Sequence, residues 1–197
     1  MSVALVRSIL LNMNEPIDPR WKSIRVLMFV DHIYEDLELW YPRLRLEEAG
    51  ARVDVAGPEK GQIYAGKHGY PARSDCDFSE INVSDYRALV IPGGFMPDKL
   101  RRDEQVLKIT RLFQEEGRLI AFICHAGWIP ISARIVRGRR VTSTPGIRDD
   151  LENAGATWVD EPVVVDGNFI TARRPPDLPD FGREIVRYLQ KELDQRG

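Results

Sequence analysis

Short, mostly apolar runs alternate with amphipathic stretches along the chain. The runs are rich in β-branched residues, which is typical of strands covered on both faces, as in a parallel sheet. They lie at residues 24–30, 52–56, 87–91 and 118–124. Between and after them, apolar side chains recur at helical spacing at residues 35–49, 103–116, 125–136, 147–153 and 179–193. This order predicts an α/β three-layer sandwich, with helices on both faces of a mostly parallel sheet.

Three local features refine this pattern. Pro42 lies inside the first predicted helix, so we expect that helix to begin late or to kink. Residues 57–70 are rich in glycine and turn residues, which predicts a loop or a small hairpin. The stretch V-V-V-D-G-N-F-I-T at residues 163–171 predicts a hairpin that turns at D-G-N. We interpret residues 1–22 as an N-terminal arm and residues 23–197 as a single domain.

Composition and charge indicate which classes of binding partner and which kinds of site are not expected. The 197 residues carry a net charge of -2, which offers no general attraction to nucleic acid or to an anionic membrane. The apolar N-terminal stretch is interrupted by Arg7 and lacks the cleavage site of a signal peptide. Two cysteines, Cys76 and Cys124, make no disulfide framework, and the scattered histidines make a poor metal site. We therefore expect a cytoplasmic protein with no metal, no cofactor, no nucleic-acid partner and no membrane association.

Candidate chemistry gathers where predicted strands end. In parallel α/β sheets, sites lie at the carboxyl ends of the strands. Three segments occupy such positions, and we expect them to meet at one edge of the sheet. They are residues 31–36, the turn Pro92-Gly93-Gly94 and the pair Cys124-His125.

Cys124 ends a buried run and precedes small residues, as a nucleophile on a tight strand-to-helix turn would require. The helix that follows would favour a thiolate through its dipole, and free backbone N–H groups at the turn could bind an oxyanion. Gly94 is placed to offer a second N–H donor. The alternative is a small cysteine that merely packs in the core, beside an ordinary glycine turn.

Several residues are candidates for a general base and for a carboxyl group beside the Cys124 sulfur. Glu35, the first carboxylate of Y-E-D-L-E-L, could point into the cleft, whereas a favourable charge at a helix N-terminus explains Asp36 and Glu38 adequately. No histidine follows His125, so a triad of cysteine with a later histidine and glutamate is absent. The base must be His125 itself or a carboxylate. The other two histidines, His32 and His68, are expected to be structural.

At these residues the sequence resembles the ThiJ/PfpI family of the class I glutamine-amidotransferase-like superfamily. The resemblance runs from about residue 24 to residue 193. It rests on the ordered motifs Y-E-D-L-E-L-W-Y-P, G-K-H-G-Y, V-I-P-G-G, A-F-I-C-H-A-G, G-R-R-V-T-S-T-P, N-A-G-A-T-W-V-D-E-P-V-V-V-D-G-N-F-I-T-A-R and P-D-L-P. It implies a flavodoxin-like fold and a homo-oligomer with sites near subunit interfaces.

The same resemblance assigns roles to individual residues. It makes Cys124 the nucleophile, His125 its partner, and Glu35 a protonated carboxyl that donates a hydrogen bond to the thiolate. Such a carboxyl is expected to hold its proton, because two anions in one confined site cannot both ionise easily. The backbone N–H groups of Gly94 and His125 would form the oxyanion hole.

Two positions depart from the peptidase branch of the family. Asp98 stands where the peptidase has a glutamate that orients the histidine of a neighbouring subunit. Thr144 stands where the peptidase has a tyrosine near the nucleophile. Both departures weaken the peptidase assignment more than they weaken the thiol chemistry.

These observations predict a cysteine-dependent, hydrolase-like enzyme of the PfpI type, an intracellular peptidase or a protein deglycase. The alternative activity is that of a glyoxalase III, which converts 2-oxoaldehydes to 2-hydroxy acids. The substrate would accordingly be a small aldehyde or a peptide or protein. Two non-catalytic classes remain open, a binding module and a stress-protection protein that senses oxidants by forming a sulfinate at Cys124. Cys76 is flanked by aspartates, so we expect it to be alkylated more slowly than Cys124.

Overall fold

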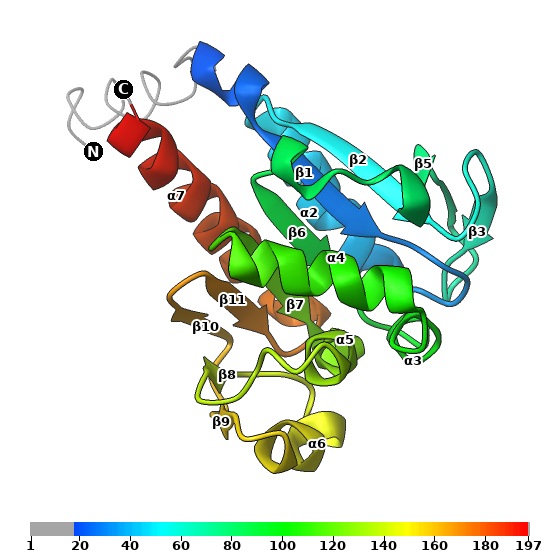
Figure 1. The fold of residues 1–197 in the computed structure, drawn as a ribbon, viewed down its shortest axis with the longest axis vertical. Helices are drawn as coiled ribbons and strands as arrows, with labels where there is room; N and C mark the ends of the chain where they lie inside the picture. Colours follow the sequence, from blue (N-terminus) through cyan, green and yellow to red (C-terminus); the bar gives the residue numbers. More distant parts are fainter. Residues whose placement is uncertain (1–17, 197) are drawn as a thin grey trace, which may run out of the picture.

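The computed structural model describes residues 18–196 and is built around a seven-stranded sheet (Figure 1). The strand order is β10-β11-β7-β6-β1-β2-β5, and every neighbouring pair is parallel except β10 with β11. The strands are β1 (Arg25–Phe29), β2 (Arg52–Gly57), β5 (Cys76–Asp77), β6 (Ala88–Ile91), β7 (Leu119–Ile123), β10 (Val163–Asp166) and β11 (Phe169–Ala172).

Helices cover both faces of this sheet. On one face α2 packs against α7, and on the other α4 packs against α5 (Figure 1). The helices are α2 (Asp36–Glu48), α3 (Met96–Leu100), α4 (Glu104–Glu115), α5 (Trp128–Ser132), α6 (Arg148–Asn153) and α7 (Leu178–Arg196). The predicted three-layer, mostly parallel α/β fold is confirmed. The core lies between the layers, and β6 and β7 are buried along their whole length.

Smaller elements complete the structure. The turn-rich stretch contains a hairpin of β3 (Ile63–Ala65) and β4 (Pro71–Arg73), in agreement with the prediction. A second small sheet joins β8 (Arg140–Val141) and β9 (Thr157–Trp158) in parallel. The 3-10 turns are η1 (Pro19–Ser23), η2 (Phe78–Glu80), η3 (Val83–Asp85), η4 (Cys124–Gly127), η5 (Pro145–Ile147) and η6 (Pro175–Asp177). Among the helices described here, none is long and apolar enough to cross a membrane.

Two predicted helices differ from the structure. The helix expected at residues 125–136 is only the turn η4 followed by the five residues of α5, and Arg134 adopts a positive φ of 62° just after it. The helix expected to begin late or to kink at Pro42 begins at Asp36 and continues to Glu48. Because proline has no N–H, the carbonyl of Glu38, four residues earlier, has no helical donor.

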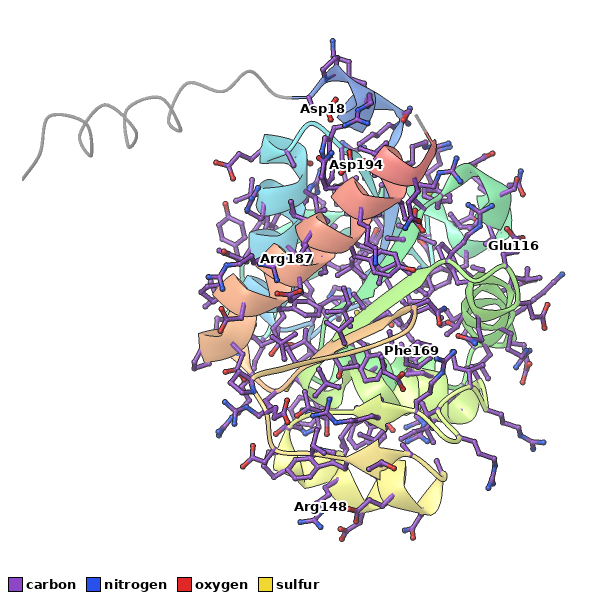
Figure 2. All side chains as sticks on the ribbon, turned by 90° about the vertical axis from the view of Figure 1, so that its left-hand side faces the viewer. Asp18, Glu116, Arg148, Phe169, Arg187 and Asp194 are labelled. Atoms are coloured by element: carbon purple, nitrogen blue, oxygen red, sulfur yellow. The ribbon has the colours of Figure 1, made fainter. Side chains whose placement is uncertain are left out.

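The described part of the N-terminal arm packs on α7. Trp21 is 3% exposed, and its Nε1–H donates to Gln190 Oε1 over 2.7 Å. Arg20 forms an ion pair of 2.9 Å with Asp194, and Asp18 lies at the same end of the molecule (Figure 2). Residues 1–17 of the expected arm lie outside the described residues.

The topology brings the three predicted site segments together. The chain leaves β1 for β2 on one side and later places β6 on the other side of β1, which makes a topological switch point. The loops that follow β1 and β6 are joined there by a bridge between Tyr34 and Gly94. The N–H of Glu35 donates to the carbonyl of Gly93 over 3.1 Å. Cys124 follows β7, the next strand along.

Candidate active site

Cys124 sits on a strained turn directly after β7. Its φ is 61°, in the left-handed region that residues with a side chain rarely adopt, and it begins the turn η4. Its neighbour Gly127 packs tightly, since a Cβ there would come within 2.9 Å of Ile147 Cδ1. The small residue expected in this turn therefore fits a closely packed position. The turn places the sulfur at the carboxyl end of the sheet.

The sulfur opens into a cavity of about 120 Å³. The cavity combines residues from the loops after β1, β6 and β7 with one residue from the β3–β4 hairpin. Its lining consists of Glu35, Lys67, Gly94, Phe95, Cys124, His125 and Trp128. A space of this volume accommodates a small molecule of a few heavy atoms.

Two backbone N–H groups act on the sulfur. Those of His125 and Gly94 lower the pKa of Cys124, because they favour its ionised form. Gly94 has a φ of 85°, and a Cβ at this position would come within 2.4 Å of the Ile33 carbonyl oxygen. Only glycine allows this close approach. Both donors predicted for an oxyanion hole therefore lie at the sulfur, while their binding of an oxyanion stays a prediction.

The carboxyl group beside the sulfur belongs to Glu38, so the assignment of this position to Glu35 is wrong. Glu35 caps α2, and its Oε2 accepts the N–H of Glu38 over 2.8 Å. Glu38 lies one turn further on, fully buried, and its Oε2 accepts the N–H of Gly93 over 2.8 Å. A Cβ on Gly93 would meet both this carboxyl oxygen and Cys124 Cβ. Glu35 lines the cavity, and its charge raises the pKa of Glu38.

Burial and mutual repulsion set the protonation of this pair. Burial, together with the charge of Glu35, raises the pKa of Glu38 to about 8. Burial, together with the charge of Glu38, raises the pKa of Cys124 to about 12, although the two backbone N–H groups lower it. At neutral pH the site therefore holds a thiol and a carboxylic acid. The structure does not favour the expected thiolate, because burial and the Glu38 carboxyl together raise the pKa of Cys124.

His125 is placed to take the thiol proton. Its Nδ1 lies 3.2 Å from Cys124 Sγ, and its ring is half-buried. Burial, together with the positive charge of Lys67, lowers the pKa of His125 below its ordinary value. The imidazole is therefore neutral at pH 7 and can act as a base. Since protonation of Glu38 removes its negative charge, the sulfur ionises more readily beside the neutral acid than beside the carboxylate.

Comparison with known proteins agrees with this arrangement. Residues 24–188 match the model of the DJ-1/PfpI family. The chain belongs to the DJ-1/PfpI family. The resemblance inferred from the sequence is confirmed, and it extends over the strands and loops that build the cavity.

Relatives within the DJ-1/PfpI family are similar over most of the chain. The protein named deglycase PfpI from Pyrococcus furiosus is 45% identical over 167 residues, which are 85% of this chain and 100% of that protein. General stress protein 18 from Bacillus subtilis is 37% identical over 169 residues, covering 85% of this chain and 98% of that protein.

Solved structures of the family share the fold. A two-domain protein from Anabaena variabilis with DJ-1/ThiJ/PfpI-like and ferritin-like domains has a TM-score of 0.83 and 36% identity, covering 85% of this chain and 48% of that one. DJ-1beta from Drosophila melanogaster has a TM-score of 0.80 and 28% identity, covering 85% of this chain and 90% of that one.

Two further residues assigned from the family pattern lie outside the cavity lining. Asp98 lies on α3 and forms an ion pair with Arg102. Its expected contact with His125 of the partner subunit stays a prediction. Thr144 precedes η5 and makes no capping hydrogen bond with its side chain. The nearby Gly146 faces His125 Nε2, since a Cβ there would lie 3.6 Å from that nitrogen.

The other two histidines of this DJ-1/PfpI member make hydrogen bonds at the β3–β4 hairpin. His32 Nδ1 accepts the N–H of Ala65 over 3.2 Å, and its ring packs against Tyr64. The backbone N–H of His68 donates to Asp36 Oδ2 over 2.9 Å. Within residues 18–196, no group of three histidine, cysteine or acidic side chains is arranged to hold a metal ion.

Sequence reasoning missed four residues of the site. Glu38 was explained as a helix-end charge, and the cavity walls Lys67, Phe95 and Trp128 were not considered. Lys67 belongs to the quoted G-K-H-G-Y motif, and Phe95 directly follows P-G-G. These positions in the motifs were the sequence signal available for Lys67 and Phe95. No sequence signal pointed to Trp128, because an aromatic residue four positions after the cysteine is equally compatible with core packing.

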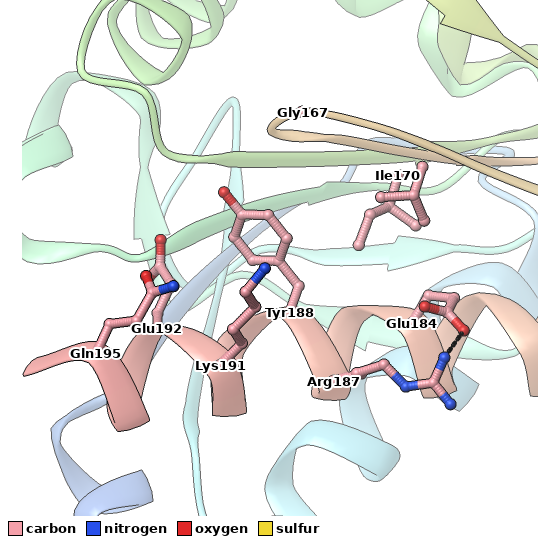
Figure 3. Close-up of a pocket in the computed structure, with 9 residues that line it drawn as sticks. Gly167, Ile170, Glu184, Arg187, Tyr188, Lys191, Glu192 and Gln195 are labelled. Carbon is pink, nitrogen blue, oxygen red and sulfur yellow. Dashed lines mark hydrogen bonds and ion pairs between the residues drawn. The ribbon is translucent and has the colours of Figure 1, made fainter.

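A second cavity, of about 330 Å³, lies at the opposite end of β7, between α7 and the β10–β11 hairpin (Figure 3). Gly167 lines it, just before β11, which pairs with the start of β7. Tyr188 and Lys191 project into it from α7. Arg187 and Glu184, which also line it, form an ion pair of 2.6 Å. None of the predicted site residues lies there.

Proposed function

We propose that the chain is a cysteine-dependent deglycase that removes 2-oxoaldehyde adducts from amines and releases a 2-hydroxy acid. The observation that carries the proposal is the geometry at Cys124. Its sulfur faces two backbone N–H donors and lies 3.2 Å from His125 Nδ1, inside a cavity of about 120 Å³. The relative from Pyrococcus furiosus is named a deglycase, which supports the same chemistry.

The first step attacks the carbon that carries both the amine and a hydroxyl group. His125 takes the proton of the Cys124 thiol as the new carbon–sulfur bond forms. The carbon–nitrogen bond breaks, and the proton held by His125 leaves with the amine. The product at the sulfur is a hemithioacetal next to the ketone. The neutral histidine beside the sulfur lets the thiol lose its proton in the same step as the attack.

The second step converts the hemithioacetal into a thioester. A proton moves from the carbon bound to sulfur to the neighbouring ketone carbon, while electrons shift so that the first carbon becomes a carbonyl and the second carries the hydroxyl. The N–H groups of Gly94 and His125 stabilise the oxyanion that develops. His125 and Glu38 supply the base and the acid. Water then cleaves the thioester, which restores the thiol and releases the 2-hydroxy acid.

A second candidate is the conversion of free 2-oxoaldehydes, which is favoured by the volume of the cavity. The free aldehyde enters the same sequence when the thiol adds to its carbonyl without displacing an amine. A peptide would need a groove for its flanking residues, and about 120 Å³ is too small for one.

The proposal is tested with a purified adduct of methylglyoxal and N-acetyllysine. Recovered amine and released lactate are measured for the wild type, for Cys124→Ser and for Cys76→Ser as the matched control. We expect the wild type and Cys76→Ser to remove the adduct faster than it dissociates spontaneously, and Cys124→Ser to act at the background rate.

Adduct loss limited by spontaneous dissociation, with rapid consumption of free methylglyoxal, would establish the second candidate instead. Turnover that survives in Cys124→Ser would rule out both.

A further inference from the structure

The mouth of the cavity carries an exposed aromatic side chain. Phe95 is 65% exposed, although it lines the cavity that contains Cys124. It directly follows Gly94, whose N–H points at the sulfur. Its own N–H donates to the carbonyl of Ile33 over 2.8 Å, so its backbone is fixed while its ring is left available.

Trp128 forms a second aromatic wall of the same cavity. Its ring centroid lies 5.2 Å from that of His125, with an angle of 47° between the ring planes. Its Nε1–H donates to Asp150 Oδ2 over 2.8 Å, and the guanidinium of Arg101 lies 5.7 Å from the ring centroid. The indole is thus held from several sides and forms a rigid surface beside the base.

The cavity has room for only one part of a larger substrate. A cavity of about 120 Å³ has room for the two adjacent carbonyl carbons, so we expect a larger substituent to extend past Phe95 and Trp128. Aromatic substituents gain from contact with aromatic rings beyond what their apolar area contributes. The charged wall residues, Glu35 and Lys67, have opposite signs and so create no clear preference for a charged substituent.

We propose that Phe95 and Trp128 make the site selective for 2-oxoaldehydes, and adducts of them, that carry an aromatic substituent. This inference rests on the proposed function and names its substrate class. Phe95 is a specificity residue at the mouth. Trp128 has two tasks, since it forms the inner wall and also positions His125.

The test compares phenylglyoxal with methylglyoxal in the wild type, in Phe95→Ala and in Leu44→Ala. Leu44 is a suitable control because it is 57% exposed and lies on α2 outside the cavity lining. We expect Phe95→Ala to lower kcat/KM for phenylglyoxal about fivefold, in line with the loss of one aromatic contact and its area. Its kcat/KM for methylglyoxal should change less than about twofold, because the methyl group does not reach the mouth.

Equal losses for the two substrates, or none, would overturn the assignment. So would a Phe95→Ala variant whose mass by light scattering differs from that of the wild type while its substrate ratio is unchanged, because Phe95 would then be a contact between subunits. Leu44→Ala is expected to leave both values unchanged.

A second measurement requires no turnover and so separates this inference from the proposed function. The rate of Cys124 alkylation by iodoacetamide is followed by mass spectrometry in the presence of acetophenone or acetone, which share an acetyl group. We expect acetophenone to protect the sulfur at lower concentration, and Phe95→Ala to lose most of this advantage. Equal protection by the two ketones would reject the aromatic preference even if the enzyme consumes 2-oxoaldehydes.

Discussion

Replacement of Glu38 by glutamine should remove a pH-dependent penalty from the stability of the protein. Glu38 is fully buried, its Oε2 accepts the N–H of Gly93, and its Oε1 has no hydrogen bond of ordinary geometry within the described residues. Glutamine has nearly the same shape. It can accept from Gly93 with its oxygen and present its N–H₂ group towards the sulfur, as the protonated acid presents its O–H.

The magnitude follows from the raised pKa. The pKa of Glu38 rises from 4.5 in the unfolded chain to about 8 in the folded protein. Between these values the folded state binds a proton that the unfolded state has lost, so the free energy of unfolding falls as pH rises. The loss is about 1.4 kcal/mol per pH unit and amounts to about 5 kcal/mol above pH 8. Glutamine cannot ionise and avoids this loss.

The assay is urea unfolding of the wild type and of Glu38→Gln at one protein concentration, at steps from pH 5 to pH 9. Titrating groups remote from Glu38 are common to both proteins and cancel in the difference. Cys124, whose pKa the Glu38 charge raises, contributes little below pH 8, because its thiol is protonated in both the folded and the unfolded state there. The variant should gain stability relative to the wild type as pH rises to about 8 and little beyond it, by about 3 to 5 kcal/mol over the range. A difference that stays constant from pH 5 to pH 9 would refute the reasoning, because Glu38 would then ionise as it does in water.

Three further changes probe other parts of the structure. Gly94→Ala should abolish turnover and destabilise the fold by about 2 kcal/mol or more, because its Cβ would strike the carbonyl of Ile33; kinetics and urea unfolding measure both effects. On the acidic side of the pH profile, kcat/KM should fall with a midpoint below pH 6.5, because the pKa of His125 is lowered and only the neutral ring accepts the thiol proton. A midpoint above pH 7 would contradict this role of His125. Trp21→Ala should cost about 3 kcal/mol in thermal or urea unfolding, because Trp21 is buried and bonded to Gln190; an unchanged midpoint would show that the arm contributes nothing.

Much of the architecture could be predicted because its signals are local. Continuous apolar runs identified β1, β6 and β7 as buried strands, and the rule that sites lie at carboxyl ends of parallel strands then brought Gly94 and Cys124 together. The two-residue strand β5 and the short helix α3 were not predicted, since such elements are too short to show a hydrophobic periodicity. Their form depends on tertiary contacts rather than on pattern.

The choice between Glu35 and Glu38 shows where sequence reasoning stopped. Both carboxylates lie within the first turn of one helix, three residues apart. Their roles depend on which residue is the N-cap, and a shift of the helix start by a few residues would exchange them. The extended backbone of Glu35 makes it the cap and turns Glu38 towards the sulfur. The same limit applies to the thiol, whose pKa depends on burial and on the Glu38 carboxyl.

The most direct test of the account is to trap the covalent intermediate on Cys124. The wild type is mixed with methylglyoxal, quenched with acid during turnover, digested and analysed by mass spectrometry. We predict that the peptide containing Cys124 gains the mass of one methylglyoxal unit, which the hemithioacetal and the thioester share, and that Cys124→Ser shows neither the adduct nor turnover. Turnover without an adduct at Cys124, undiminished in Cys124→Ser, would contradict a nucleophilic role for this sulfur.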